Sequence, residues 1–207
     1  MDNDLNSVKT KRAGRGYHHG ALRQALIEAA EAVIAERGVD GFSLRETARR
    51  AGVSPAAPAH HFGDARGLLT ALATEAFRRF GDSLAAADVG ETRTERLRSQ
   101  GMAYVRFALA ERAKFDLMWR YGLVDGDDPD LREAGRRAFA VLDEAARGRS
   151  ERKTDSLDPA VAPSIASWSM VHGFARLALD GAFGTAPGDA ERAADQLLPL
   201  VLRHLDV

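Results

Sequence analysis

The chain has 207 residues, of which 45% are hydrophobic and 29% are charged, as in an ordinary globular protein with a sizeable core. It contains no cysteine, which excludes disulfides, zinc–thiolate sites and thiol catalysis. No apolar run is long enough to span a bilayer, and the polar start is not a secretory signal. We therefore expect a cytoplasmic protein with no membrane partner.

The net charge of −1 is unevenly distributed along the chain. Residues 1–80 carry 12 Lys and Arg against 9 Asp and Glu, whereas residues 81–207 carry 17 against 21. A basic front part and an acidic rear part are typical of a head that approaches nucleic acid, attached to a neutral body.

The spacing of apolar residues predicts helices throughout and no strand, so the fold class is all-α. The predicted helices cover roughly residues 21–37, 44–51, 55–61, 65–86, 92–110, 112–122, 130–147, 159–183 and 189–205. We divide the chain into a flexible basic arm (1–20), a three-helix helix-turn-helix head (21–66, with the motif at about 44–63), and a helical effector-binding and dimerisation domain (67–207).

Two short predicted helices meet at a tight turn, which is the signature of a helix-turn-helix. Ser43, with Glu46 three residues later, has the spacing of a capping box. Gly52 permits the turn, and Val53 fills the space between the helices. Ser54 and Pro55 then begin a second helix that would lie in the major groove of DNA.

Three segments in this order, 42–48, 51–54 and 61–69, resemble the DNA-binding head of the TetR family of repressors. The resemblance covers about residues 20–80 and implies that the helix at 55–61 is the recognition helix. It also implies that the amides beginning the next helix hold a backbone phosphate, as a helix N-terminus can.

The pattern departs from the family at two positions. Arg66 stands where the family usually has Lys, and it keeps the charge for a phosphate contact. Ala59 replaces a usual aromatic residue, so one backbone contact is missing and a thymine methyl contact takes its place as an option.

The arm residues before the first helix either follow phosphates or the minor groove, or form a solvated tail. Arg45 begins the first motif helix, which favours a DNA contact over a merely solvated one, whereas Arg49 and Arg50 are assigned to the surface. The predicted DNA-contacting set is Tyr17, His18, Arg45, Thr47, Ser54, Ala56, Ala57, Ala59, His60, His61 and Arg66.

Residues 81–207 hold most of the aromatic side chains, which form either a helical core or the lining of a ligand cavity. We expect Phe107, Phe115, Trp119 and His172 to edge a pocket for a small-molecule effector. His172 has no His or carboxylate at the neighbouring helical positions, and Arg176 lies at that spacing, so no metal site is predicted. No cofactor is predicted either.

The segment 168–174 resembles the Trp…His-Gly motif of one TetR C-terminal subgroup, and the family places dimerisation on the last two long helices. These helices would bury apolar positions against a second copy as a four-helix bundle. The predicted homodimer interface is Trp168, Val171, Ala175, Leu179, Leu197, Leu198, Val201 and Leu205.

Together these features predict a DNA-binding regulator, a repressor by its resemblance, that binds a palindromic double-stranded operator and leaves it when an effector binds. An enzyme is not expected, because the sequence has no phosphate loop, no Gly-x-Ser-x-Gly elbow and no His-Glu-x-x-His pair. A helical ligand-binding or protein-interaction module without DNA activity stays open as the alternative.

Overall fold

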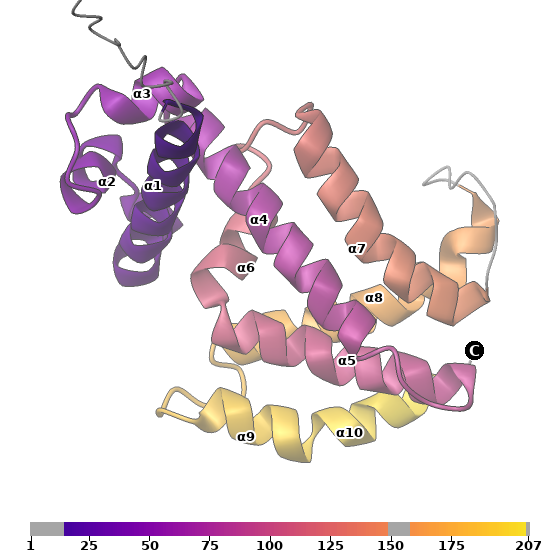
Figure 1. The fold of residues 1–207 in the computed structure, drawn as a ribbon. Coiled ribbons are helices and arrows are strands. Elements are labelled where there is room, and N and C mark those ends of the chain that lie inside the picture. The colour runs from indigo at the N-terminus through magenta and orange to yellow at the C-terminus, as the bar shows by residue number, and fades with distance from the viewer. Residues whose placement is uncertain (1–14, 149–157, 206–207) are drawn as a thin grey trace, which may run out of the picture.

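The computed structural model describes residues 15–148 and 158–205, and within them the chain is helical without a strand (Figure 1), which confirms the all-α prediction. The elements are α1 (Arg15–Arg37), η1 (Val39–Gly41), α2 (Leu44–Arg50), α3 (Ala57–Phe62), α4 (Ala65–Ala86), α5 (Arg93–Ala110), α6 (Arg112–Met118), α7 (Pro129–Arg147), η2 (Pro159–Val161), α8 (Ala162–Leu179), α9 (Asp189–Gln196), α10 (Leu198–Val201) and η3 (Leu202–His204).

The helices α1, α2 and α3, with the start of α4, form a head at one end of the molecule (Figure 1). Leu26, Ile27 and Ile34 of α1 are buried, and Ile27 and Ile34 belong to the same apolar cluster as Leu68 of α4. Burying one such side chain stabilises the fold by about 1.5–3 kcal/mol. Helix α4 begins in the head and continues into the body, so this one helix packs against elements of both parts.

The body consists of α4 packed along α7, α5 packed along α8, and α9 with α10 lying against α5 (Figure 1). Local signals fix where these helices begin. Thr92 and Glu95 form a reciprocal capping box at the start of α5. Asp128 caps α7 by accepting the Leu131 N–H at 2.8 Å, and Pro129 occupies the first helical position.

Several predicted boundaries are wrong, and the helix predicted to reach residue 122 ends at Met118. The first helix begins at Arg15, so residues 15–20 are helical rather than part of the predicted arm, and residues 1–14 lie outside the described residues. The long helix predicted at the C-terminus is interrupted at Leu197, because Pro199 has no N–H for the helical ladder and crowds the preceding turn. The helix predicted to reach residue 183 ends at Leu179, ahead of Gly181 in the left-handed region.

Candidate nucleic-acid interface and ligand cavity

The turn between α2 and α3 has the predicted geometry. Ser43 caps α2 by accepting the Glu46 N–H at 3.4 Å. The Glu46 carboxylate binds Arg49 and Arg50 instead of returning to the cap, so only half of the predicted capping box forms. Gly52 has a φ of 68°, which a residue with a side chain rarely adopts, and this conformation reverses the chain.

The second motif helix starts later than predicted. The Ala57 N–H donates to the Ser54 carbonyl at 3.0 Å in a turn, and α3 begins at Ala57 without a side-chain cap. Ser54 and Pro55 therefore precede the helix instead of opening it. Pro58, near the helix start where an N–H is dispensable, is buried against the head.

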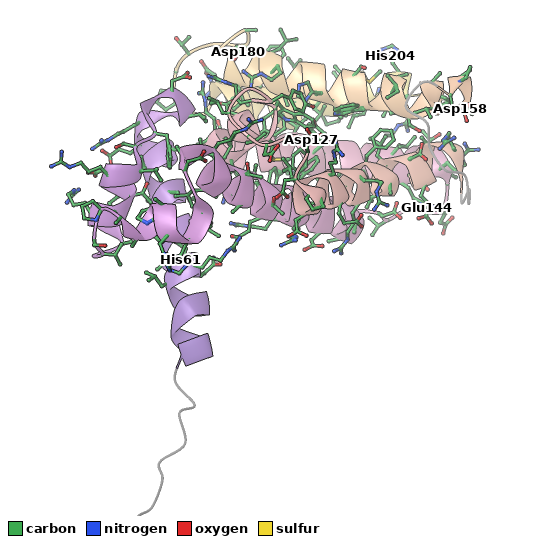
Figure 2. All side chains as sticks on the ribbon, turned by 90° about the horizontal axis from the view of Figure 1, so that it is seen from above. His61, Asp127, Glu144, Asp158, Asp180 and His204 are labelled. Atoms are coloured by element: carbon green, nitrogen blue, oxygen red, sulfur yellow. The ribbon has the colours of Figure 1, made fainter. Side chains whose placement is uncertain are left out.

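Most of the predicted DNA-contacting side chains share the outer surface of the head, and Figure 2 places His61 on the head, at the end of the molecule away from Glu144 and Asp158. The exposed members of this set are Arg45, Ser54, Ala56, Ala59, His60 and Arg66, and Ala57 and His61 are half-buried. Tyr17 and His18 lie in the first turns of α1, and their side chains are outside the described part of the structure.

Thr47 does not belong to this surface. Its side chain is fully buried, and its hydroxyl donates to the Ser43 carbonyl at 2.9 Å. The prediction of a side-chain contact from Thr47 to DNA is therefore wrong, because the residue packs inside the head and secures the first turn of α2.

An ion-pair network holds α2 against α1. Arg50 donates to both Glu46 and Glu36, and Arg49 donates to Glu46 with two nitrogens, at 2.7 and 2.8 Å. The hydrogen bonds from Arg49, and then those from Arg50, lower the pKa of Glu46 to about 2. Arg49 and Arg50 are thus occupied within the head, whereas no partner of the Arg45 side chain is found among the described residues.

Replacing Glu46 by glutamine is expected to destabilise the head at neutral pH. The difference in the free energy of unfolding between the two proteins should narrow in acid. Since the folded pKa lies below the ordinary value of 4.5, the carboxylate stabilises the fold above that value. This contribution is lost as pH falls through the folded pKa of about 2. Urea unfolding of both proteins between pH 7 and pH 2 measures the gap, and an undiminished gap at pH 2 would contradict the assignment.

The start of α4 joins the recognition helix to the body. Asp64 caps α4 by accepting the Gly67 N–H at 2.8 Å. A Cβ at Gly67 would lie 2.0 Å from the Phe62 carbonyl oxygen, so α3 ends in direct contact with the first turn of α4. The Arg66 Nε–H donates to the Val124 carbonyl at 3.1 Å. This side chain therefore contacts the body, although more than half of its surface remains exposed to solvent.

The body contains a cavity of about 1320 Å³ that is lined mainly by apolar side chains. Its walls come from α4, α5, α6 and the following loop, α7 and α8. The lining residues are Phe77, Phe80, Leu84, Tyr104, Met118, Trp119, Tyr121, Val124, Gly126, Leu131, Arg132, Gly135, Arg136, Ala138, Phe139, Ala140, Leu142, Asp143, Glu144, Gly148, Val161, Ile165 and Trp168.

Only one of the four residues predicted to edge this cavity lines it. Trp119 does, whereas Phe107 and Phe115 are buried in the core and His172 is not among the lining residues. Trp168, predicted for the dimer interface, lines the cavity instead. Aromatic spacing on a helix identifies a buried face, but it does not indicate whether that face meets packed side chains or an open space.

A hydrogen-bonded chain of rings supports the cavity wall. The Trp168 Nε1–H donates to the Tyr104 hydroxyl oxygen at 3.2 Å, and this hydroxyl lies 2.8 Å from Nδ1 of His172. The Tyr104 oxygen accepts from Trp168, which leaves its O–H available to donate to Nδ1 of a neutral His172 that carries its proton on Nε2. Burial, with a smaller effect of Arg176, lowers the pKa of His172 and favours this neutral form.

The predicted interface residues on the last helices mostly point inward. Val171, Ala175, Leu179, Leu198 and Leu205 are buried in the chain's own core, so assigning them to a dimer interface was wrong. Leu197 is 44% exposed, and Val201 is half-buried, so these two remain at the surface.

The outward apolar side of these helices is a different set, which we call the outer face. It comprises Ser169, Met170, Gly173 and Leu177 of α8 together with Leu197, Leu200 and Val201 at α9–α10. Leu177 and Leu200 are about half exposed. The four-residue steps from Ser169 to Leu177 could have indicated this face, but the sequence carries an equally regular apolar stripe on the opposite side of α8.

Comparison with known proteins covers both parts of the chain. Residues 97–201 match the family described as "Tetracyclin repressor-like, C-terminal domain", and residues 26–72 match "Bacterial regulatory proteins, tetR family". The HTH-type transcriptional repressor AcnR of Corynebacterium glutamicum is 28% identical over 184 residues, which are 86% of this chain and 89% of that protein.

Solved structures with the same fold include a protein with unknown function from Rhodococcus sp. RHA1, 33% identical with a TM-score of 0.68, covering 91% of this chain and 97% of that one. The TetR family transcriptional regulator PfmR of Thermus thermophilus has a TM-score of 0.62 at 22% identity, covering 88% and 99%. Across the described residues, no helix combines the length and apolar character needed to cross a bilayer. The same residues contain no group of three His, Cys, Asp or Glu side chains placed to hold a metal ion.

Proposed function

Because this chain belongs to the tetR family of bacterial regulatory proteins, it is a DNA-binding transcriptional regulator, and we propose that it is a repressor released from its operator by a ligand. The observation that carries the proposal is the combination of an exposed helix-turn-helix surface with a large apolar cavity in one chain.

The DNA-reading surface that we propose consists of Arg45, the turn before α3, and the exposed side of α3. Arg45 supplies charge at the start of α2, and His60 supplies ring nitrogens near the end of α3. Ala59 is exposed and small enough to lie against a thymine methyl group. The Arg66 side chain, which is 56% exposed, would hold a phosphate at the edge of this surface.

The ligand that we propose is large, mostly apolar and without net charge. The lining is dominated by aromatic and aliphatic side chains, and its volume exceeds that of most drug-sized sites. Its cations are engaged with nearby carboxylates, Arg132 with Asp127 and Arg136 with Glu133. Asp143 is held by Arg147 and by the Ser164 hydroxyl, so a charged ligand would have to compete with existing pairs.

Two copies would meet through the outer face and present two heads to a palindromic operator. Half-sites about one helical turn apart, roughly 34–36 Å, suit such a two-fold arrangement. Gly173 and Ser169 permit close approach of two α8 helices, and Leu177 and Leu200 supply the apolar area. A ligand that binds better to one spacing of the heads shifts the population away from the DNA-bound form.

The direct test is selection of bound duplexes from a random double-stranded DNA library, followed by titration of the selected site. Replacing Arg45 by alanine should weaken binding by about 5- to 150-fold for each head that loses one base or phosphate contact of about 1–3 kcal/mol. If Arg45 contacts a phosphate, the substitution should also make the DNA affinity less dependent on salt concentration.

Arg49→Ala is the matched control, since that guanidinium lies on the same helix but is bound to Glu46. It should change affinity far less than Arg45→Ala does. Failure to enrich any sequence, or equal effects of the two variants, would count against the proposed surface.

A further inference from the structure

The cavity in the body is long rather than compact. Its lining residues on α7 begin at Leu131 and end at Gly148, directly after the last turn of the helix. At 1.5 Å of rise per residue, this stretch spans about 25 Å. A compact cavity of about 1320 Å³ would measure only about 11 Å across, the cube root of that volume. Asp127, just before α7, lies closer to the head than Glu144, near the end of α7 (Figure 2), so the long direction of the cavity leads away from the head.

The end of the cavity nearer the head, which we call the mouth, is open and polar. It is lined by Tyr121, in the loop after α6, and by Arg132 and Arg136, in the first turns of α7. All three side chains are more than half exposed. A polar group of a ligand would therefore stay in contact with water at the mouth.

The opposite end, which we call the far end, is buried and mostly apolar. Asp143 lines it, but its carboxylate accepts from the Arg147 Nε–H and from the Ser164 hydroxyl, both at 2.6 Å. The far end is therefore suited to the end of an apolar chain rather than to a further polar group. The apolar side chains that line it, all of them buried, are Leu84, Leu142 and Val161.

Between its ends the cavity has an apolar wall. Aromatic side chains dominate this wall, among them Phe77, Phe80, Phe139 and Trp168. Ile165 also lines the cavity and is partly exposed, so an apolar side chain borders its open side as well. An extended apolar chain would bury its whole length against this wall, and each methylene moved out of water would raise the affinity about fourfold.

We infer that the ligand is an uncharged amphiphile with one long apolar chain, which lies along α7 with its tail at the far end and its polar head at the mouth. This inference rests on the proposed function and names the class of its ligand. The guanidinium groups of Arg132 and Arg136 have more N–H donors than their pairs with Asp127 and Glu133 use. The remaining donors can bind the oxygen atoms of an uncharged head.

A series of alkyl β-D-maltosides tests the shape of the ligand, because the sugar head is constant and only the chain length changes. Octyl, decyl, dodecyl and tetradecyl compounds are titrated into the full chain by calorimetry, below the concentrations at which they form micelles. The affinity should rise about fourfold per added methylene, at least as far as the dodecyl chain. A compact cavity would instead stop the rise near the octyl chain.

A bulky residue at the far end should shorten the chain that the cavity accepts. In Leu142→Trp we expect dodecyl maltoside to bind about tenfold more weakly, the effect of about two methylenes left in water. The affinity for octyl maltoside should change by less than about twofold. Arg137→Trp is the matched control, since Arg137 is on the same helix but does not line the cavity and pairs with Asp82. It should leave both affinities unchanged.

Equal effects of the two variants on dodecyl maltoside, or an affinity that stops rising at the octyl chain, would overturn the inference. If Leu142→Trp does not fold, Val161→Trp replaces it, because Val161 lines the same end from η2. The compounds are also added to protein bound to a selected DNA duplex. Binding that follows chain length but leaves the duplex bound would support this ligand class and refute the proposed release. Release by compact molecules, with no gain from chain length, would refute only the inference.

Discussion

Replacing Gly67 by alanine is expected to abolish specific DNA binding while leaving most of the body folded. The added Cβ would lie 2.0 Å from the Phe62 carbonyl oxygen, a distance that no adjustment of a side chain can relieve. The backbone at the end of α3 must move, at a cost of about 1–3 kcal/mol or more for an overpacked site. Since several contacts of about 1–3 kcal/mol move together, affinity should fall by at least about 100-fold.

Fluorescence anisotropy with the selected duplex measures the loss, and thermal unfolding followed by circular dichroism measures the remaining stability. Gly135→Ala is the control, a helical glycine whose Cβ has ordinary space around it. It should keep DNA binding and stabilise α7 by up to about 1 kcal/mol. A Gly67→Ala protein that binds the duplex normally would contradict this prediction, because it would show that the backbone between α3 and α4 can shift without disturbing the DNA-binding surface.

Placing a carboxylate on the outer face should convert the dimer to monomer. In Leu177→Asp the new charge lies within the proposed contact between two α8 helices, where it would be buried without a partner. Loss of the second head removes the gain from simultaneous binding of two half-sites, so operator affinity should fall by about 10²–10⁴-fold. Sedimentation equilibrium reports the mass, and the same duplex titration reports the affinity.

Val89→Asp is the matched control for this charge. Val89 is 59% exposed in the turn between α4 and α5, outside the outer face. It should leave both the mass and the affinity unchanged. A Leu177→Asp protein that remains dimeric would show that the dimer interface lies on another surface.

The parts of the fold that follow from local rules were predictable. Capping residues and turn glycines lie next to the elements they control, so Ser43 and Gly52 identified the motif without tertiary information. The same reasoning placed the start of α3 too early, because Ser54 and Pro55 fit a helix opening as well as a preceding turn. The interruption at Leu197 was missed although Pro199 was visible in the sequence.

The orientation of helix faces was not predictable from the sequence. Helix α8 is apolar on two sides, with Val171 and Ala175 inward and Leu177 outward, and periodicity alone does not say which side meets the core. The position of Arg66 depends on a carbonyl 58 residues away in sequence, at Val124. The cavity likewise arises from helices that meet only in three dimensions, so of the predicted lining residues only Trp119 was identified correctly.

The placement of Trp119 and Trp168 has a practical consequence. They are the only two tryptophans in the chain, both line the cavity, and their ring centroids are 5.5 Å apart. Indole emission responds to the polarity around the ring and is quenched by nearby absorbers. The native protein therefore carries its own optical sensor of cavity occupancy, and a library of small molecules can be screened by ultraviolet fluorescence before any operator is known.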